Sequence, residues 1–180
     1  MFYRRSFIAT VVTVAATPAS AQLKAPPALP AKWYGVQADD NAFVVEMPGV
    51  PDHRLINDRS ARGTAFVLHS YSLDFGGYSY VAQTALYPGD VDVSQPRRLI
   101  QAALDERAKV LATRKWSKVD WRDAAGATAA DSTGSLSGGN ALRQLVLLKG
   151  RRFASLAFMG PAASMTGVEA ERFFKSLKMK

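Results

Sequence analysis

The sequence predicts an α+β fold: a mainly antiparallel sheet with helices packed on it, forming an α/β sandwich. Apolar residues alternate with period two in several segments, and short turn-forming links join neighbouring segments as hairpins. One helical segment separates two groups of strands, and a second closes the chain. Two late segments are apolar at nearly every position, so their strands are expected to be covered on both faces.

The first group of strands begins with residues 43–47, a β-branched and aromatic run that ends at Pro48. Residues 64–73 and 78–87 alternate with period two on either side of Gly76-Gly77. Paired glycines free the backbone to turn, so these two segments predict a hairpin.

An amphipathic helix is expected over residues 96–113 and is expected to lie on the sheet. Ser94 can cap this helix, and Pro96 suits its first turn, where a missing N–H has no consequence. Apolar residues recur at helical spacing, with polar residues between them. The apolar positions are Leu99, Ile100, Ala103, Leu104 and Leu111.

The second group of strands comprises residues 118–122 and 127–136, followed by the two apolar runs at 142–148 and 153–159. Beyond them, Thr166 and Glu169 have the spacing of a capping box. This spacing predicts a short C-terminal helix, whose apolar side holds Phe173, Phe174 and Leu177.

Residues 1–21 are typical of a cleavable export signal. A positive start is followed by an uncharged run and by the small-x-small pattern that a signal peptidase recognises. The residues that carry this pattern are Arg4, Arg5, Phe7, Ala19 and Ala21. The Arg-Arg-x-Phe start also resembles the twin-arginine export motif, with an ordinary secretory signal as the alternative. We therefore expect a periplasmic protein.

The remaining chain divides into a Pro- and Ala-rich leader, residues 22–32, and one α+β domain, residues 33–180. The 180 residues include no cysteine, which excludes a disulfide, a thiol nucleophile and a thiolate metal site. We expect a monomer with no transmembrane segment in the mature chain.

The formal net charge is +8, and the basic residues are concentrated in residues 97–180. Such asymmetry is typical of proteins that bind an anionic partner, here an acidic protein or an anionic envelope surface. Ordinary solvated charge is the alternative. Nucleic acid is not expected, because exposed aromatics are not interleaved with these residues. The candidate partner-binding residues are Arg97, Arg98, Lys149, Arg151 and Arg152.

No catalytic motif was found, and we expect neither an enzyme nor a cofactor or metal site. His53 and His69 are the only histidines and lack the HxH or HExxH spacing of zinc ligands. We expect His53 in solvent and His69 partly buried and hydrogen-bonded. The alternative is a small exported hydrolase or ligand-binding protein that uses His69, with Ser70 or Asp74 near it in sequence.

Several segments in succession resemble the PsbP-like family. They are residues 43–51 (FVVEMPGVP), the strand end at Tyr87-Pro88, the mid-chain helix, Arg151-Arg152 before the last strand, and residues 172–177 (RFFKSL). The resemblance implies a binding or accessory domain, since the family shares no catalytic centre. A third alternative is a carrier of small apolar ligands, which would need a cavity between the helix at 96–113 and the sheet.

Overall fold

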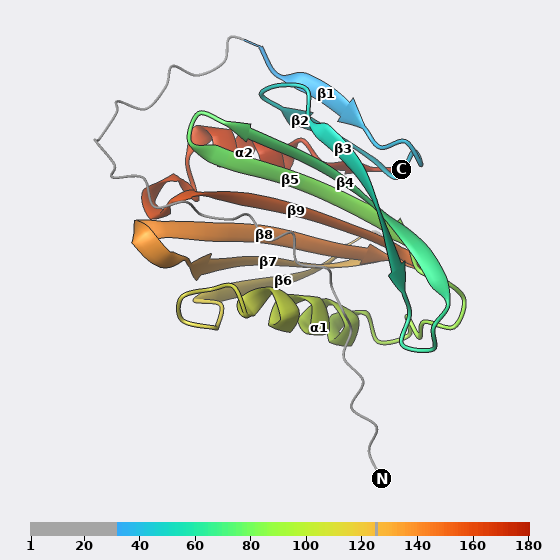
Figure 1. The fold of residues 1–180 in the computed structure, drawn as a ribbon. Coiled ribbons are helices and arrows are strands. Elements are labelled where there is room, and N and C mark those ends of the chain that lie inside the picture. Colours follow the sequence, from blue (N-terminus) through green and yellow to red (C-terminus); the bar gives the residue numbers. More distant parts are fainter. Residues whose placement is uncertain (1–31, 125) are drawn as a thin grey trace.

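The computed structural model describes residues 32–124 and 126–180, and in them the predicted antiparallel sheet and both helices are confirmed (Figure 1). The expectations for the export signal, residues 1–21, and for the leader up to residue 31 lie outside the described residues. Within the described part, no helix is long and apolar enough to cross a membrane.

The main sheet has seven antiparallel strands in the order β3-β4-β5-β9-β8-β7-β6. Their bounds are Asp52–Arg59 (β3), Ala65–Phe75 (β4), Tyr78–Leu86 (β5), Lys118–Ala124 (β6), Ala127–Ser135 (β7), Asn140–Lys149 (β8) and Arg152–Pro161 (β9). The predicted hairpin of β4 and β5 is confirmed. The sequence analysis missed β3, because its residues (DHRLINDR) are mostly polar and none of them is buried.

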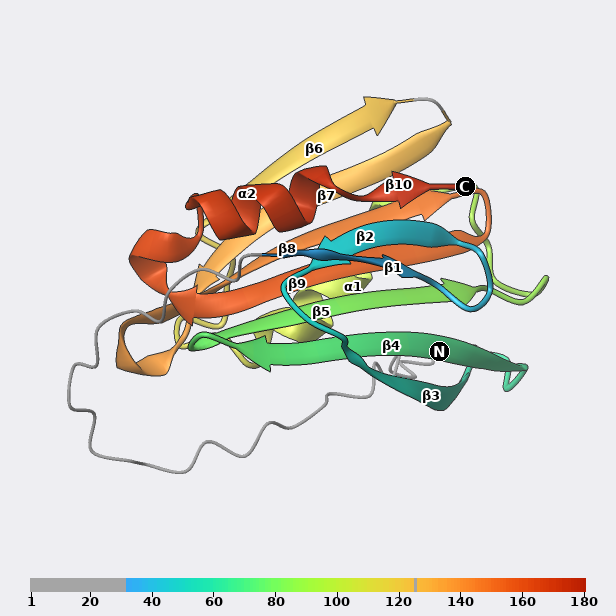
Figure 2. The same ribbon diagram turned by 90° about the horizontal axis from the view of Figure 1, so that it is seen from above.

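A smaller layer covers one face of the main sheet (Figure 2). It consists of the three-stranded sheet β1-β2-β10, with bounds Tyr34–Gln37, Phe43–Met47 and Lys178–Met179, and of α2, Val168–Lys175. We call the face beneath this layer the closed face. Its core holds the aromatic side chains Phe43, Tyr80, Phe158 and Phe173, each at most 1% exposed.

The other face of the main sheet carries α1, Pro96–Ala108, and we call it the α1 face (Figure 1). Ile100 and Leu104 of α1 belong to one apolar cluster with Val146 and Leu148 of β8. The helix ends at Ala108, five residues before the predicted end at 113. Leu111 is nevertheless buried, at 3% exposure, in the turn that follows.

Both predicted helix caps are wrong. Gln95 is the N-cap of α1 and makes no side-chain cap bond; glutamine is not among the residue types preferred at this position. Ser94 therefore lies one position too early. In α2 the N-cap is Gly167, so Thr166 also lies one position outside. Both helices depend on burial of their apolar sides rather than on side-chain caps.

Candidate functional site

The strongest candidate site is a groove between α1 and the β3–β4 hairpin. Helix α1 packs on β7 and β8, and the α1 face of β3, β4 and β5 is left uncovered beside it. Four adjoining cavities share lining residues along this side of the helix. We call them together the α1 groove; its length is marked by Arg62, Leu99, Tyr87, Phe66, Arg107 and Arg54.

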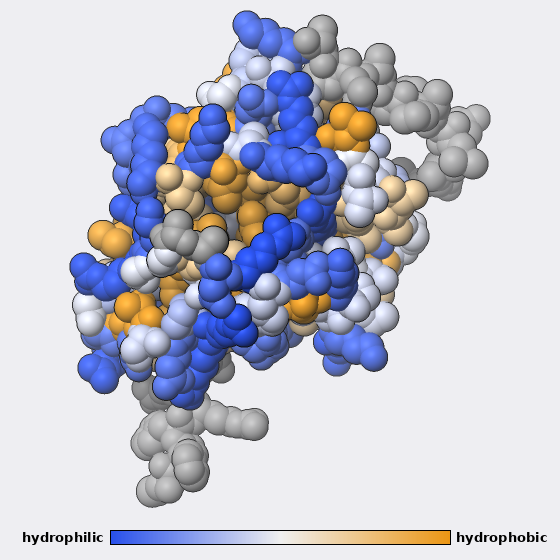
Figure 3. All heavy atoms as spheres, turned by 180° about the vertical axis from the view of Figure 1, so that it is seen from behind, coloured by the Kyte–Doolittle hydropathy of each residue, from blue (hydrophilic) through white to orange (hydrophobic). Residues whose placement is uncertain are grey.

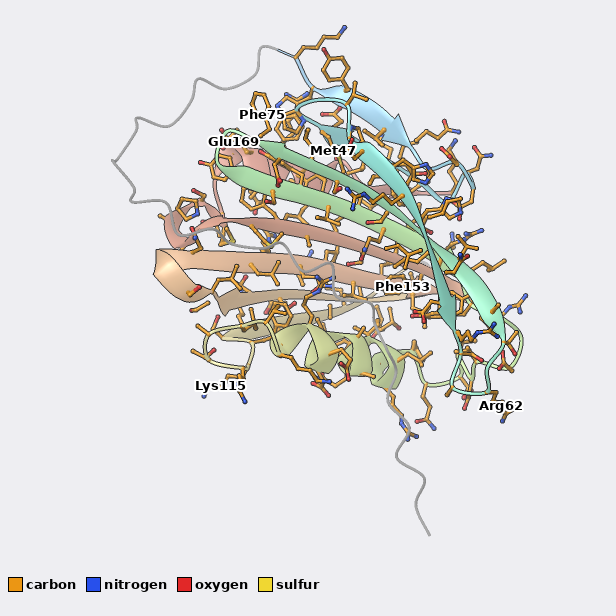
Figure 4. All side chains as sticks on the ribbon, viewed as in Figure 1. Met47, Arg62, Phe75, Lys115, Phe153 and Glu169 are labelled. Atoms are coloured by element: carbon orange, nitrogen blue, oxygen red, sulfur yellow. The ribbon has the colours of Figure 1, made fainter. Side chains whose placement is uncertain are left out.

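One end of the α1 groove is a cavity of about 290 Å³ between the β3–β4 loop and the start of α1, with polar side chains around a largely apolar surface. Ser60 organises this end, since its Oγ donates to Oδ2 of Asp90 at 2.5 Å and accepts the backbone N–H of Thr64 at 3.1 Å. The hydrogen bond from Ser60 lowers the pKa of Asp90. Arg62 lies at the tip of this loop (Figure 4) and Arg98 faces it from α1.

The middle of the groove is apolar and aromatic. The ring of Tyr87 meets Phe66 edge-on, with centroids 5.6 Å apart, and lies 5.8 Å from the ring of Phe153. Burial raises the pKa of Tyr87 to about 12, so its phenol stays neutral throughout the physiological range. Leu99 and Ala103 of α1 form the opposite wall.

The inner end is a second cavity of about 290 Å³ with mixed lining, between β3–β5 and the last turn of α1. Polar residues are direct partners on neighbouring strands here: Ser70 of β4 pairs with Gln83 of β5, and Gln83 pairs with Ser155 of β9. Nε2 of Gln83 donates to Oγ of Ser70 at 3.2 Å, and Nε2 of Gln144 donates to Oγ of Ser155 at 3.1 Å. All four side chains are buried, which is unusual for the centre of a sheet face.

Arg107 is the distinctive group of this inner end. It lines both inner cavities, and burial alone lowers the pKa of its guanidinium. Among the described residues no carboxylate forms an ion pair with it. Oε1 of Gln144, which lines the same cavity, is buried without a hydrogen-bond partner in the described part of the chain. A partly desolvated cation that forms no ion pair favours an anionic ligand, and the carboxylates that line the same two cavities, Asp58 and Glu106 in one and Asp52 and Asp74 in the other, oppose one.

The predicted partner-binding residues lie at one end of the main sheet, where α1 begins and where the β6–β7 and β8–β9 turns meet. Two of the five are already paired: Arg97 with Asp123, and Arg152 with Asp40. Arg98, Lys149 and Arg151 are exposed and have no ion-pair partner among the described residues. Binding of an acidic partner therefore rests on three residues and stays a prediction.

The structure does not bring the proposed neighbours of His69 to it. Successive strand residues face opposite sides, so Ser70 and Asp74 lie on the α1 face while His69 lies on the other. Ser70 accepts from Gln83, and Asp74 accepts from Ser79. His69 is partly buried, as expected, but its Nδ1 is buried without a hydrogen-bond partner among the described residues.

His53 is exposed, as expected. Its side chain keeps 28% exposure, because its ring stacks on the ring of Tyr71 at a centroid distance of 4.4 Å. This contact was not expected, since it depends on β3, where His53 lies directly opposite Tyr71 of β4.

The sequence contained a signal for the α1 groove that was not used. Arg107 follows Leu104 by three residues and Ala103 by four, so helical spacing places it on the apolar side of α1. A cation at such a position has to bury its charge or find a ligand. Gln83 and Gln144 likewise occupy inward positions of strands that are otherwise apolar.

Comparison with known protein families, curated proteins and solved structures found no match to this chain.

Proposed function

We propose that this protein is an exported, non-catalytic binding protein of the periplasm, and that its α1 groove takes a small amphipathic carboxylic acid. The observation that carries the proposal is Arg107, a half-buried residue whose guanidinium forms no ion pair with a carboxylate among the described residues. The export signal and the resemblance to the PsbP-like family support the location and the binding role.

The carboxylate of the ligand is assigned to Arg107. A guanidinium presents paired N–H donors that match the two oxygens of a carboxylate, and such charge-assisted bonds are roughly twice as strong as neutral ones. Gln83 supplies an amide beside Arg107 in both inner cavities. Its hydrogen bond to Ser70 holds that amide in place before a ligand arrives.

The apolar part of the ligand is assigned to the aromatic middle of the groove. Phe66, Tyr87 and Phe153 offer apolar surface next to the cavity that Arg107 lines. Burial of a methylene group contributes about 0.8 kcal/mol, so a short alkyl chain adds measurable affinity. A ligand with only one of the two features is therefore expected to bind weakly.

The proposal is non-catalytic because the groove lining, as far as the structure describes it, holds no serine paired with a histidine. Its serine–carboxylate pairs, Ser60 with Asp90 and Ser79 with Asp74, lack an imidazole base. Neither His53 nor His69 lines the four cavities.

The test is calorimetric titration of the whole protein with octanoate, 1-octanol and acetate. We expect octanoate to bind and both partial ligands to bind at least ten times more weakly. Arg107→Gln is expected to weaken octanoate binding about 10- to 100-fold, as expected for loss of a hydrogen bond to a charged group.

Arg62→Gln is the matched control, because Arg62 lies at the other end of the same groove. It should leave octanoate binding within about twofold. If Arg62→Gln weakens binding and Arg107→Gln does not, the assignment of the carboxylate to Arg107 is wrong. If octanoate and octanol bind equally, the proposed ligand class is wrong.

A further inference from the structure

On the closed-face side of the main sheet, away from the α1 groove, two histidines and an aspartate from three separate segments converge. His53 lies on β3, His69 on β4, and Asp39 in the loop between β1 and β2. One ligand atom of each lies within 4.8 Å of the other two. Nδ1 of His53 is 3.2 Å from Oδ2 of Asp39, and the two imidazole rings are nearly parallel, with centroids 5.5 Å apart.

The strand register explains why the two histidines meet. His53 is opposite Tyr71, and His69 is opposite Leu55, so the histidines are diagonal neighbours on one face of the β3–β4 pair. Diagonal positions remain within reach of long and aromatic side chains. A sequence motif such as HxH cannot detect this arrangement, because the two positions are adjacent only across the ladder.

Contacts around the cluster hold it in place. The hydroxyl of Tyr71 accepts the backbone N–H of Asp39 at 2.7 Å, while its ring stacks on His53. In the same loop, Asp40 pairs with Arg152 of β9 and accepts the backbone N–H of Ala42 at 3.1 Å. The loop that carries Asp39 is thus fixed to two strands of the main sheet before any ion binds.

One nitrogen of the cluster has no hydrogen-bond partner among the described residues. Nδ1 of His69 is buried, yet no described residue forms a hydrogen bond with it. Buried polar atoms are paired in the great majority of cases, so an unpaired nitrogen on one histidine of this cluster favours a ligand that the described residues do not supply. His69 also borders a shallow surface depression with Asp40 and Arg152, through which an ion can enter.

We propose that Asp39, His53 and His69 form a binding site for a divalent transition-metal ion of the zinc type. Two imidazoles and one carboxylate suit zinc and its neighbours in the first transition row, whereas magnesium and calcium prefer oxygen ligands alone. Zinc–nitrogen bonds of about 2.0–2.1 Å place tetrahedral ligand atoms about 3.3 Å apart, so the cluster closes slightly on binding. Asp39, whose side chain is 62% exposed, has the freedom to do this.

Three protein ligands leave a fourth position for water or an outside group. The site is independent of the α1 groove, because these residues lie on the opposite side of the sheet from the residues of the groove. The metal proposal can therefore fail while the ligand proposal holds, and the reverse is also possible.

The experiment is titration of the untagged full chain with Zn²⁺ by calorimetry, together with Co²⁺ and its visible absorption as a report on coordination geometry. We expect one ion per chain and the intense visible bands of four-coordinate cobalt. His53→Gln and His69→Gln should each weaken Zn²⁺ binding about 100-fold. Loss of a residue that only supports a metal ligand costs about 10- to 100-fold in affinity, and loss of a ligand is expected to reach at least the upper end of that range. Asp39→Asn should also weaken it.

Asp52→Asn is the matched control, since Asp52 precedes His53 and faces the opposite side of β3. It should bind Zn²⁺ like the wild type. Thermal unfolding with and without Zn²⁺ gives a second measurement, because a ligand that binds only the folded state raises the melting temperature. If a histidine variant fails to fold, Asp39→Asn is the decisive variant, because Asp39 is exposed and its replacement is not expected to disturb the fold. No binding by the wild type, or equal binding by wild type, Asp39→Asn and Asp52→Asn, overturns the proposal.

Discussion

The two faces of the main sheet differ in how completely they are covered and in whether the arginine on each face is ion-paired. The closed face is sealed by α2 and the β1-β2-β10 sheet over an aromatic core, and its half-buried Arg143 is bonded to Asp131 and Glu171. The α1 face is covered over β7 and β8 only, and its half-buried Arg107 has no such partners among the described residues. The closed face holds the aromatic core, whereas under the proposed function the α1 face keeps polar groups for a ligand at some cost in stability.

Seen from behind, apolar side chains gather at the centre of the molecule and hydrophilic ones surround them (Figure 3).

The largest expected effect is on the closed face. Phe158 is fully buried, and its ring contacts those of Tyr78 and Tyr80 at centroid distances of 5.2 Å. Phe158→Ala should reduce the free energy of unfolding by about 3–5 kcal/mol, through lost transfer energy and a residual cavity. Urea denaturation measures the change.

The control is Leu55→Ala, because Leu55 is 61% exposed. It should change the free energy of unfolding by no more than about 0.5 kcal/mol. A loss below about 1 kcal/mol for Phe158→Ala would contradict the view that the closed face carries most of the stability.

A smaller loss is expected for Arg143→Met. The Arg143 side chain is 12% exposed and bonds the carboxylates of Asp131 and Glu171, so its removal leaves Asp131 only a 3.7 Å contact with Arg122 and leaves Glu171 only Lys175. We expect a loss of about 2–3 kcal/mol at pH 7, below the full range for a buried pair because the Glu171 side chain is 33% exposed.

The same pair predicts a pH dependence. The hydrogen bond from Arg143 is the main cause that lowers the pKa of Glu171 in the folded state. Its contribution to stability is therefore full above the ordinary glutamate pKa of 4.5 and is lost as the pH falls through the lowered value. Urea denaturation of the wild type and of Arg143→Met should give a smaller difference in the free energy of unfolding in acid than at pH 7.

The smallest effect is expected for the same substitution on the other face. Arg107→Met removes a half-buried cation that forms no ion pair among the described residues, so the free energy of unfolding should stay within about 0.5 kcal/mol or increase. The two Arg→Met variants, measured side by side by urea denaturation, test the comparison directly. A loss above about 1.5 kcal/mol for Arg107→Met would mean that Arg107 supports the fold rather than a ligand.

Local pattern was enough to predict most strands and both helices. The period-two alternation of β4 and β5 and the apolar runs of β8 and β9 survive in the structure, since burial of those residues is what determines the pattern. β3 escaped prediction because its pairing with β4 is made by the backbone, while its side chains remain largely in solvent. The two helix caps were each misplaced by one residue, because backbone conformation at Gln95 and Gly167 decides the cap position.

The candidate sites were less accessible to sequence analysis. The five basic residues were identified from charge alone, and nothing in the sequence indicated that Arg97 and Arg152 have acidic partners elsewhere in the chain. Arg107 could have been noticed from helical spacing. That it has no ion-pair partner among the described residues depends on where α1 crosses the sheet.

The sequence by itself thus determined the α+β class, the positions of most elements and the absence of thiol chemistry, because each depends on composition or on contacts a few residues apart. Only the tertiary structure decided which side chains meet. It brought Asp39, His53 and His69 together from three segments, and it left Arg107 facing an uncovered part of the sheet. The physical reason is that strand register and the placement of α1 are set by packing across the whole sheet, and a periodic pattern does not specify either one.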